Sequence, residues 1–383
     1  MRTHWLLSSI TCVFLAACGG GGETNQSAAS GQEVGSGPMQ TASNQLNIYN
    51  WSDYVDPTTV EAFEKENKIT LRYDYYDSNE TLEAKVLTGK SGYDLVAPSI
   101  ANVARQIKAG AYLPIDKSQL SYYNNIDPEL LKLMDKVDPG NKYAVPYFWG
   151  VNTIGINQDQ VAKALGGALP DNLWDLVFKP EYTQKLKSCG ISFFDSPTEL
   201  FPLALHYLGK DPNSSNPDDI KAAADLLKSV RGDVKRFNSS GYINDLADGN
   251  LCVAMGYGGD LNIAKRRATE AKNNTHISVL VPKEGVGVWI DSFMIPKDAQ
   301  NVANALKYIN WTLDPKVAAK NGDFVTYAPA SKPARALMNK SYAEDPSIFP
   351  PADVMAKSFV ILPKSPDAIK LSVRLFQQIK AGQ

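Results

Sequence analysis

Aromatic residues stand beside carboxylates at the ends of several predicted strands, and this combination is the most informative feature of the sequence. Two such groups directly follow apolar strands predicted at 46–50 and 251–255, and a third lies on a long extended run. The residues concerned are Trp51, Ser52, Asp53, Tyr54, Tyr257, Asp260, Trp289 and Asp291, with Ser99 after another predicted strand and Tyr327 in a late loop. Ligands of open α/β sheets bind outside the carboxyl ends of the strands. We therefore expect these side chains to meet in one cleft, although each alone is equally typical of core packing or a helix cap.

Aromatic faces and carboxylates together suit alkyl ammonium cations. A Trp or Tyr face attracts a cation by roughly 0.5–2 kcal/mol, and a carboxylate accepts charge-assisted hydrogen bonds from the amine. Four methylenes between two amines contribute about 3 kcal/mol when buried, well short of the roughly 8 kcal/mol of a micromolar site. Both charged ends must therefore be bound. An amino-acid ligand would need an arginine for its carboxylate, and these segments contain none. They predict a small aliphatic polyamine as the ligand.

Charge and motifs argue against several other functions. The formal net charge is −2 and the 39 basic residues are scattered, which disfavours nucleic-acid binding. His206 and His276 stand in no metal-ligand spacing. The sequence has no Gly-x-Ser-x-Gly, no P-loop and no Gly-x-Gly-x-x-Gly after a strand. We therefore predict neither an enzyme nor a bound metal or cofactor.

The elements that must position these residues alternate between strand and helix. Apolar strands are predicted at 46–50, 69–73 and 93–97, with a helix starting at Pro57 and another over 100–109. A helix between them ends at Gly89, and Asp77 with Glu80 resembles a capping box at its start. Successive βαβ units of this kind predict an α/β fold with helices on both faces of the sheets.

Two long extended runs, 143–157 and 285–296, are too long for single strands of a small domain. We interpret them as crossovers between two lobes. The predicted first lobe comprises 45–148 and 290–335, and the second comprises 149–289 and 336–383.

The N-terminus has the pattern of an export signal. A short basic start and an apolar stretch suited to a signal h-region make up residues 1–17. The string 15–19 (LAACG) resembles the lipobox of bacterial lipoproteins, which predicts cleavage before Cys18 and a lipid on its sulfur; an ordinary secretory signal is the alternative. Residues 18–44 are rich in Gly, Ser, Gln and Thr and are expected to form a flexible tether. The predicted location is the periplasm, with the protein held at the membrane through its lipid.

The cysteine count points to one disulfide. Cys12 leaves with the signal and Cys18 is lipidated, so only Cys189 and Cys252 remain in the mature chain. Two thiols in an oxidising compartment favour a disulfide between them. Two buried free thiols are the alternative.

Strings throughout the mature chain resemble the periplasmic putrescine- and spermidine-binding proteins, and most of all the putrescine-specific member of that group. The resemblance covers the chain from Leu46 to near its C-terminus. The strings are 48–54 (IYNWSDY), 77–80 (DSNE), 93–99 (YDLVAPS), 130–133 (LLKL), 187–190 (KSCG), 209–214 (GKDPNS), 242–246 (YINDL), 282–285 (PKEG) and 350–353 (PPAD).

The resemblance implies a two-lobed periplasmic binding protein fold of type II, with a mixed sheet flanked by helices in each lobe and two crossover hinge strands. The ligand would lie in the cleft between the lobes. The implied ligand-binding residues are Trp51, Ser52, Asp53, Tyr54, Ser99, Glu199, Tyr257, Asp260, Trp289, Asp291 and Tyr327. Cys189 and Cys252 match the cysteines of the putrescine binder, which supports the disulfide.

Differences within the family bear on the choice of polyamine. Tyr257 replaces a Trp, and Trp289 is the residue of the spermidine binders, where the putrescine binder has Phe. Asp260 matches the putrescine type, since spermidine binders have Ser there. Ser196 and Ala101 replace an Asp and a Tyr of the spermidine cleft. We therefore predict a putrescine binder that also accepts spermidine.

The implied partners are a polyamine and the permease subunits of an ABC importer in the inner membrane, with the binding protein itself a monomer. The alternatives are a spermidine-preferring binder and a polyamine sensor that signals without transport. An enzyme acting on polyamines is disfavoured because the sequence has no cofactor motif and no nucleophile constellation.

Overall fold

The computed structural model describes residues 44–382. Its first lobe is built on a three-stranded parallel sheet in the order β2-β1-β3. The central strand β1 (Gln45–Trp51) pairs with β2 (Thr70–Tyr76) along its whole length and with β3 (Leu95–Val96) near its end. The helices of this lobe are α1 (Pro57–Asn67), α2 (Asn79–Val86), α3 (Ile100–Lys108), α4 (Pro128–Met134), α12 (Val302–Leu313) and α13 (Pro315–Val325), and β4 (Tyr112–Leu113) pairs with β11 (Ile295–Pro296).

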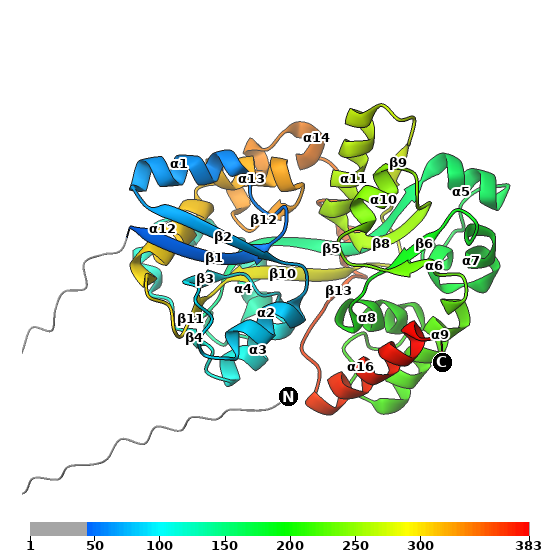
Figure 1. Cartoon of the computed structure of the whole chain (residues 1–383), viewed down its shortest axis with the longest axis horizontal. Helices are drawn as coiled ribbons and strands as arrows, with labels where there is room; N and C mark the ends of the chain where they lie inside the picture. The colour runs from blue at the N-terminus through cyan, green and yellow to red at the C-terminus, as the bar shows by residue number, and fades with distance from the viewer. Residues whose placement is uncertain (1–43, 383) are drawn as a thin grey trace, which may run out of the picture. The chain divides into compact units, whose positions relative to one another are not determined.

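A larger mixed sheet joins the two lobes. Its path is β13-β10-β5-β8-β6-β7, and β5 (Val145–Asn157) is antiparallel to β10 (Gly287–Phe293). Figure 1 shows β5 and β10 running together from the half of the fold that contains β1 to the half that contains β6. The other strands are β6 (Ile191–Phe193), β7 (Arg236–Phe237), β8 (Val253–Tyr257), β9 (Ile277–Val279), β12 (Ala328–Pro329) and β13 (Phe359–Val360).

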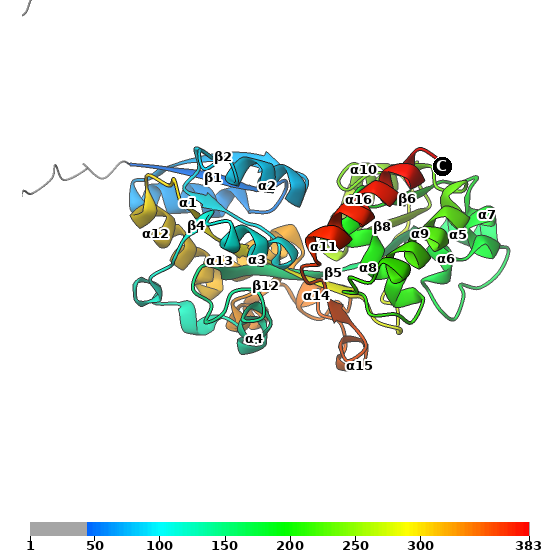
Figure 2. The ribbon, with the colours of Figure 1, turned by 90° about the horizontal axis from the view of Figure 1, so that it is seen from below.

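Helices cover this sheet in the second lobe. Figure 2 shows the C-terminal helix α16 (Pro366–Lys380) lying beside α8 (Pro197–Tyr207) and α9 (Pro217–Arg231). The remaining helices are α5 (Gln158–Leu165), α6 (Asp175–Phe178), α7 (Pro180–Leu186), α10 (Tyr242–Ala247), α11 (Gly258–Ala271), α14 (Lys340–Ala343) and α15 (Ala352–Met355).

Each lobe has its own cluster of buried apolar side chains. On β5, Phe148 belongs to the cluster of the first lobe and Val151 to that of the second. On β10, Trp289 belongs to the cluster of the first lobe and Val288 to that of the second. The two strands therefore leave one core and enter the other within three residues, which explains why both are long and almost entirely buried.

Most predicted elements are present, with two local corrections. The third strand, predicted over 93–97, is shorter in the structure and comprises only Leu95–Val96. The predicted capping box is wrong, because the N-cap of α2 is Ser78, whose hydroxyl accepts a hydrogen bond from the backbone N–H of Thr81. Ser and Asp are both good N-cap residues, and the strand that ends at Tyr76 leaves Asp77 one residue too early for the cap.

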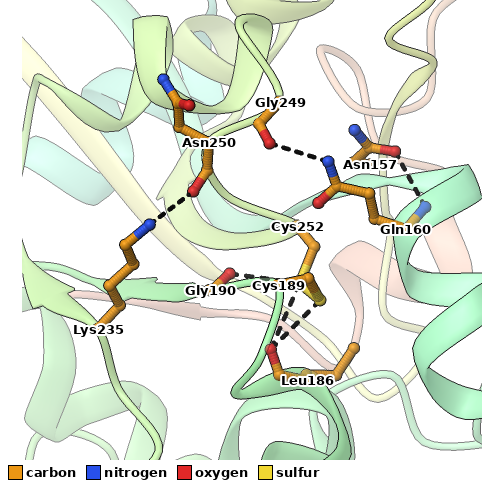
Figure 3. The surroundings of a disulfide bond; sticks show 9 residues. All are labelled: Asn157, Gln160, Leu186, Cys189, Gly190, Lys235, Gly249, Asn250 and Cys252. Atoms are coloured by element: carbon orange, nitrogen blue, oxygen red, sulfur yellow. Dashed lines mark hydrogen bonds between the residues drawn. A yellow bond between two sulfur atoms is a disulfide. The ribbon is translucent and has the colours of Figure 1, made fainter.

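Cys189 and Cys252 form the predicted disulfide, which links the segment after α7 to the start of β8 (Figure 3). Its cysteines are 63 residues apart in sequence. We expect replacement of both by alanine to lower the free energy of unfolding by about 4 kcal/mol, because the open chain regains the entropy that the closed loop had lost. Urea unfolding measures this, and reduction of the wild-type protein should give the same loss. Equal midpoints for the variant and the oxidised wild type would contradict a stabilising role.

The predicted signal peptide, lipobox and most of the tether fall in 1–43, outside the described residues. Within the described part of the chain, no helix combines the length and the apolar character needed to cross a membrane.

Candidate functional site

A cavity of about 60 Å³, counted as space for the centres of water-sized spheres, lies between the two lobes. This space suits a slender molecule, since a single water needs about 10–15 Å³ by the same measure. Its lining contains four carboxylates and no Lys, Arg or His. The lining residues are Trp51, Ser52, Tyr54, Tyr76, Asp77, Asn79, Ser99, Glu199, Ser239, Ser240, Tyr257, Asp260, Trp289, Asp291 and Tyr327.

The Asp291 carboxylate is held in place by Tyr54 and Ser99, two residues of the first lobe. The register of β10 against β5 shifts between Asp291 and Ser292, an irregularity of the kind that re-aims a side chain. The Tyr54 hydroxyl donates to the Asp291 carboxylate at 2.9 Å, and Ser99 forms an isolated β-bridge with Asp291. Burial raises the pKa of Asp291 to about 8, against the opposing effect of hydrogen bonds from Tyr54 and Ser99. Among the described residues, no basic side chain forms an ion pair with this carboxylate.

Asp260 lies in the first turn of α11, directly after β8. It accepts hydrogen bonds from the Tyr327 hydroxyl at 2.6 Å and from the Tyr242 hydroxyl at 3.0 Å. Its backbone N–H donates to the Tyr327 oxygen at 3.1 Å, so the Tyr327 side chain ties the first lobe to this helix. Burial raises the pKa of Asp260 to about 6, although both tyrosines and the N-terminal end of the helix favour the charged form.

Glu199 is the third buried carboxylate and belongs to the first turn of α8. It is 3% exposed and accepts a short hydrogen bond from the Asn152 side chain on β5. Burial raises the pKa of Glu199 to about 7, the hydrogen bond from Asn152 lowers it, and the charge of Glu80 raises it further. Three carboxyl groups thus line one cavity with raised pKa values, which is the signature of a site that awaits positive charge.

Aromatic rings form the walls between these carboxylates. The Trp289 ring meets Tyr327 edge-on at 5.1 Å between centroids and Tyr257 at 6.0 Å. In the first lobe Trp51 packs on Tyr76 at 4.6 Å. The N–H of the Trp51 ring donates to the carbonyl of Ala97 at 2.9 Å, which fixes its orientation. Such faces attract a cation and exclude water from its methylene chain.

Two polar contacts join the lobes at the edges of the cavity. The Arg267 guanidinium on α11 lies 3.3 Å from the Asp53 carboxylate, and the Thr198 hydroxyl on α8 donates to Glu80 at 3.3 Å. Asp53 also has a positive φ of 54°, in the left-handed region. The two lobes are therefore in contact, in a closed conformation.

All the residues expected at the site except Asp53 line this one cavity. Asp53 instead lies outside it, more than half exposed, in the ion pair with Arg267. The expectation missed Tyr76, Asp77, Asn79, Ser239 and Ser240. Tyr76 ends β2 and Asp77 follows it, so the strand-end rule would have found both, whereas the two serines lie in a loop that no pattern singled out.

Comparison with known proteins shows the family of this chain. The family described as bacterial extracellular solute-binding protein matches residues 58–350. The chain belongs to this family. It is 47% identical over 351 residues to the putrescine-binding periplasmic protein PotF of Escherichia coli (strain K12), covering 91% of this chain and 95% of that protein. It is also 47% identical over 348 residues to the putrescine-binding periplasmic protein SpuD of Pseudomonas aeruginosa (strain UCBPP-PA14), covering 91% and 95%.

Solved structures of this solute-binding family share the two-lobed fold. The spermidine/putrescine ABC transporter substrate-binding protein PotD of Streptococcus pneumoniae aligns with a TM-score of 0.72 and 29% identity, over 88% of this chain and 99% of that one. The TpPotD lipoprotein of Treponema pallidum aligns with a TM-score of 0.75 and 26% identity, over 88% and 99%. These relatives are solute-binding proteins and not enzymes, so the chain is a binding protein.

Closure of this solute-binding protein requires a glycine at 259. A Cβ there would lie 2.5 Å from the Tyr327 ring. Because Gly259 belongs to the second lobe and Tyr327 packs with the first, the clash arises only when the lobes close. We expect Gly259→Ala to weaken ligand binding at least roughly ten-fold, as one overpacked contact would, with little change in melting temperature.

The matched control is Gly167→Ala, where a Cβ meets open space. Calorimetric titration and thermal unfolding of both variants test this expectation. Wild-type affinity in Gly259→Ala, or equal weakening in Gly167→Ala, would contradict it.

Proposed function

We propose that this protein binds a small aliphatic polyamine, with putrescine preferred, in the cavity between its lobes. One observation supports this most strongly. Three carboxyl groups, those of Glu199, Asp260 and Asp291, line a cavity that has aromatic walls and, among the described residues, no basic side chain. Glu199 and Asp291 are almost fully buried and Asp260 is partly buried. A dication supplies the charge that these groups lack.

The same lining argues against the other common ligands of binding proteins. An amino acid, a sugar acid or a phosphate brings an anionic group, which would meet carboxylates with no Arg or Lys among the lining residues. A buried charge without a partner costs several kcal/mol. A diamine avoids this cost at both ends, and its methylenes contact the rings of Trp289 and Tyr257 at about 0.8 kcal/mol each.

Putrescine is favoured among polyamines for two reasons. Asp260, held by Tyr242 and Tyr327, offers a carboxylate for the second amine of a short diamine. The names of the two most similar relatives given above also specify putrescine. Relatives named spermidine/putrescine-binding periplasmic proteins, from Salmonella typhimurium and Escherichia coli, are 36% and 37% identical.

In transport, the lobes would close over the ligand and the protein would deliver it to a permease. The ligand would be trapped as the lobes rotate about β5 and β10, with hinges near 148–149 and 289–290. The closed, monomeric protein would then dock on the permease of an ABC importer in the inner membrane. A lipid on Cys18 would keep it at the membrane in the periplasm, with 18–44 as the tether.

Isothermal titration calorimetry tests the binding proposal. The domain from residue 44 onward is freed of carried-over ligand by partial unfolding and refolding, and is titrated with putrescine, cadaverine, spermidine and lysine. We expect a micromolar or lower Kd for putrescine, weaker binding of spermidine and no binding of lysine. Tighter binding of spermidine than of putrescine would overturn the preference, and no heat with any amine would overturn the polyamine assignment.

A further inference from the structure

Asp77 is a cavity residue to which neither the fold nor the proposed site gives a role. Because Ser78 caps α2, the Asp77 carboxylate is not used by the helix. Among the residues that the structure describes, it makes no hydrogen bond or ion pair, and its side chain is exposed at the rim of the cavity. A free carboxylate at the end of a cation-binding cavity is available to a ligand that extends past the buried groups.

The residues that flank Asp77 are held firmly. The Tyr76 hydroxyl donates to the carbonyl of Ala97 at 2.7 Å, and the Asn79 side chain accepts from the backbone N–H of Ser99 at 3.1 Å. Tyr76 is 3% and Asn79 is 5% exposed. Since Ser99 also neighbours Asp291, the backbone of Asp77 is fixed relative to the buried part of the site.

The second lobe presents hydroxyl groups to the same cavity. Ser239 and Ser240 lie in the loop before α10. The Ser239 oxygen accepts from the backbone N–H of Asp195 at 3.0 Å, which anchors the loop at the start of α8. Within the described residues, the Ser240 hydroxyl has no hydrogen-bond partner, so it is free to accept one from a ligand.

We propose that Asp77, with Ser239 and Ser240, forms an outer subsite for the third ammonium of a linear triamine. This inference rests on the proposed function. Asp291, Glu199 and Asp260 serve the two amines of a diamine inside the cavity. A third amine on a propyl extension is too polar to be buried without its own acceptor, and the rim supplies a carboxylate and hydroxyl oxygens. The outer subsite therefore sets how well the protein accepts longer polyamines alongside putrescine.

The test compares three ligands by calorimetry in one buffer: putrescine, spermidine and N-propylputrescine, which carries the propyl extension of spermidine but lacks its third amine. Asp77→Asn removes the rim charge and keeps the size of the side chain. Asp74→Asn is the matched control, because Asp74 lies on β2, shortly before Asp77, but binds Arg72 and Tyr93 outside the cavity. For Asp77→Asn we expect spermidine to bind roughly three- to ten-fold more weakly, as for a partly exposed charge pair.

Putrescine and N-propylputrescine should stay within about two-fold of their wild-type Kd values, and Asp74→Asn should change no ligand by more than that. Equal weakening of all three ligands by Asp77→Asn would overturn the inference, because it would indicate a general field effect. Wild-type protein that binds spermidine no better than N-propylputrescine would also overturn it while leaving the diamine function intact. Wild-type protein that binds none of the three would instead refute the proposed function.

Discussion

Replacement of Asp291 by asparagine is expected to weaken putrescine binding by at least about a hundred-fold without destabilising the protein. The side chain is 5% exposed, and asparagine keeps its size while removing the charge. Loss of one member of a buried, hydrogen-bonded charge pair costs roughly 2–5 kcal/mol of binding energy. Titration calorimetry at pH 7.5 measures the loss.

The same substitution should stabilise the ligand-free protein relative to wild type as the pH rises. Burial raises the pKa of Asp291 to about 8, so the folded protein without ligand holds a proton there that the unfolded chain has released. This contribution to stability is complete below the unfolded pKa of about 4 and is lost as the pH rises through the folded value. Asparagine cannot ionise, so the melting temperature of the variant relative to wild type should rise with pH from about 4 to 8 and stay constant at higher pH.

Asp218→Asn is the matched control, because Asp218 is an exposed residue of α9 with the same charge and size. It should bind putrescine like the wild type. An Asp291→Asn protein that binds putrescine within ten-fold of wild type would contradict the role of Asp291, and a variant that melts much earlier at every pH would indicate a structural role instead.

Binding of putrescine is expected to release protons near neutral pH. In the closed, empty cavity the pKa values are about 8 for Asp291, about 7 for Glu199 and about 6 for Asp260. At pH 6.5 Asp291 and Glu199 are therefore mainly protonated and Asp260 is mainly ionised. Each bound proton must leave before an ammonium can pair with the carboxylate. On the order of one to two protons should be released per putrescine at pH 6.5, and close to none at pH 9.

Calorimetry in two buffers of different ionisation enthalpy counts these protons. The affinity should also fall as the pH is lowered from 8 to 6, by up to about ten-fold per pH unit for each proton released. Glu199→Gln is the informative variant, since it removes one titrating group and should reduce the number of protons released at pH 6.5. A count of zero at pH 6.5, with an affinity that does not vary with pH, would mean that the carboxylates are already ionised before binding.

Much of the fold could be predicted because its determinants are local. The apolar string 46–50 lies in β1 and the apolar string 251–255 overlaps β8, and the two long extended runs form the antiparallel pair β5 and β10. The site residues at strand ends could be predicted for the same reason. Trp51 and Tyr257 are the last residues of β1 and β8, and both strands end at the same cavity, so their convergence follows from the rule for open sheets.

The remaining details depend on contacts that no local pattern records. Asp77 and Ser78 are both suitable N-cap residues, and only the exact end of β2 decides between them. Asp53 belongs to the same string as Trp51 and Tyr54, yet its positive φ turns it out of the cavity toward Arg267, which is 214 residues away in sequence. Ser240 lines the cavity only because the second lobe folds its loop toward it, and the residues around Ser240 in the sequence do not predict this position.

The central claim, that the cavity selects a small dication, is tested most directly by native mass spectrometry in a competition. The ligand-free domain is equilibrated with an equimolar mixture of putrescine, cadaverine, spermidine and lysine, where lysine differs from cadaverine only by its carboxylate. We predict one ligand per chain, with putrescine the most abundant, cadaverine next and lysine absent. Lysine bound at a level comparable to cadaverine would contradict the account, because a cavity lined by Glu199, Asp260 and Asp291 and by no cation would then tolerate an anionic group.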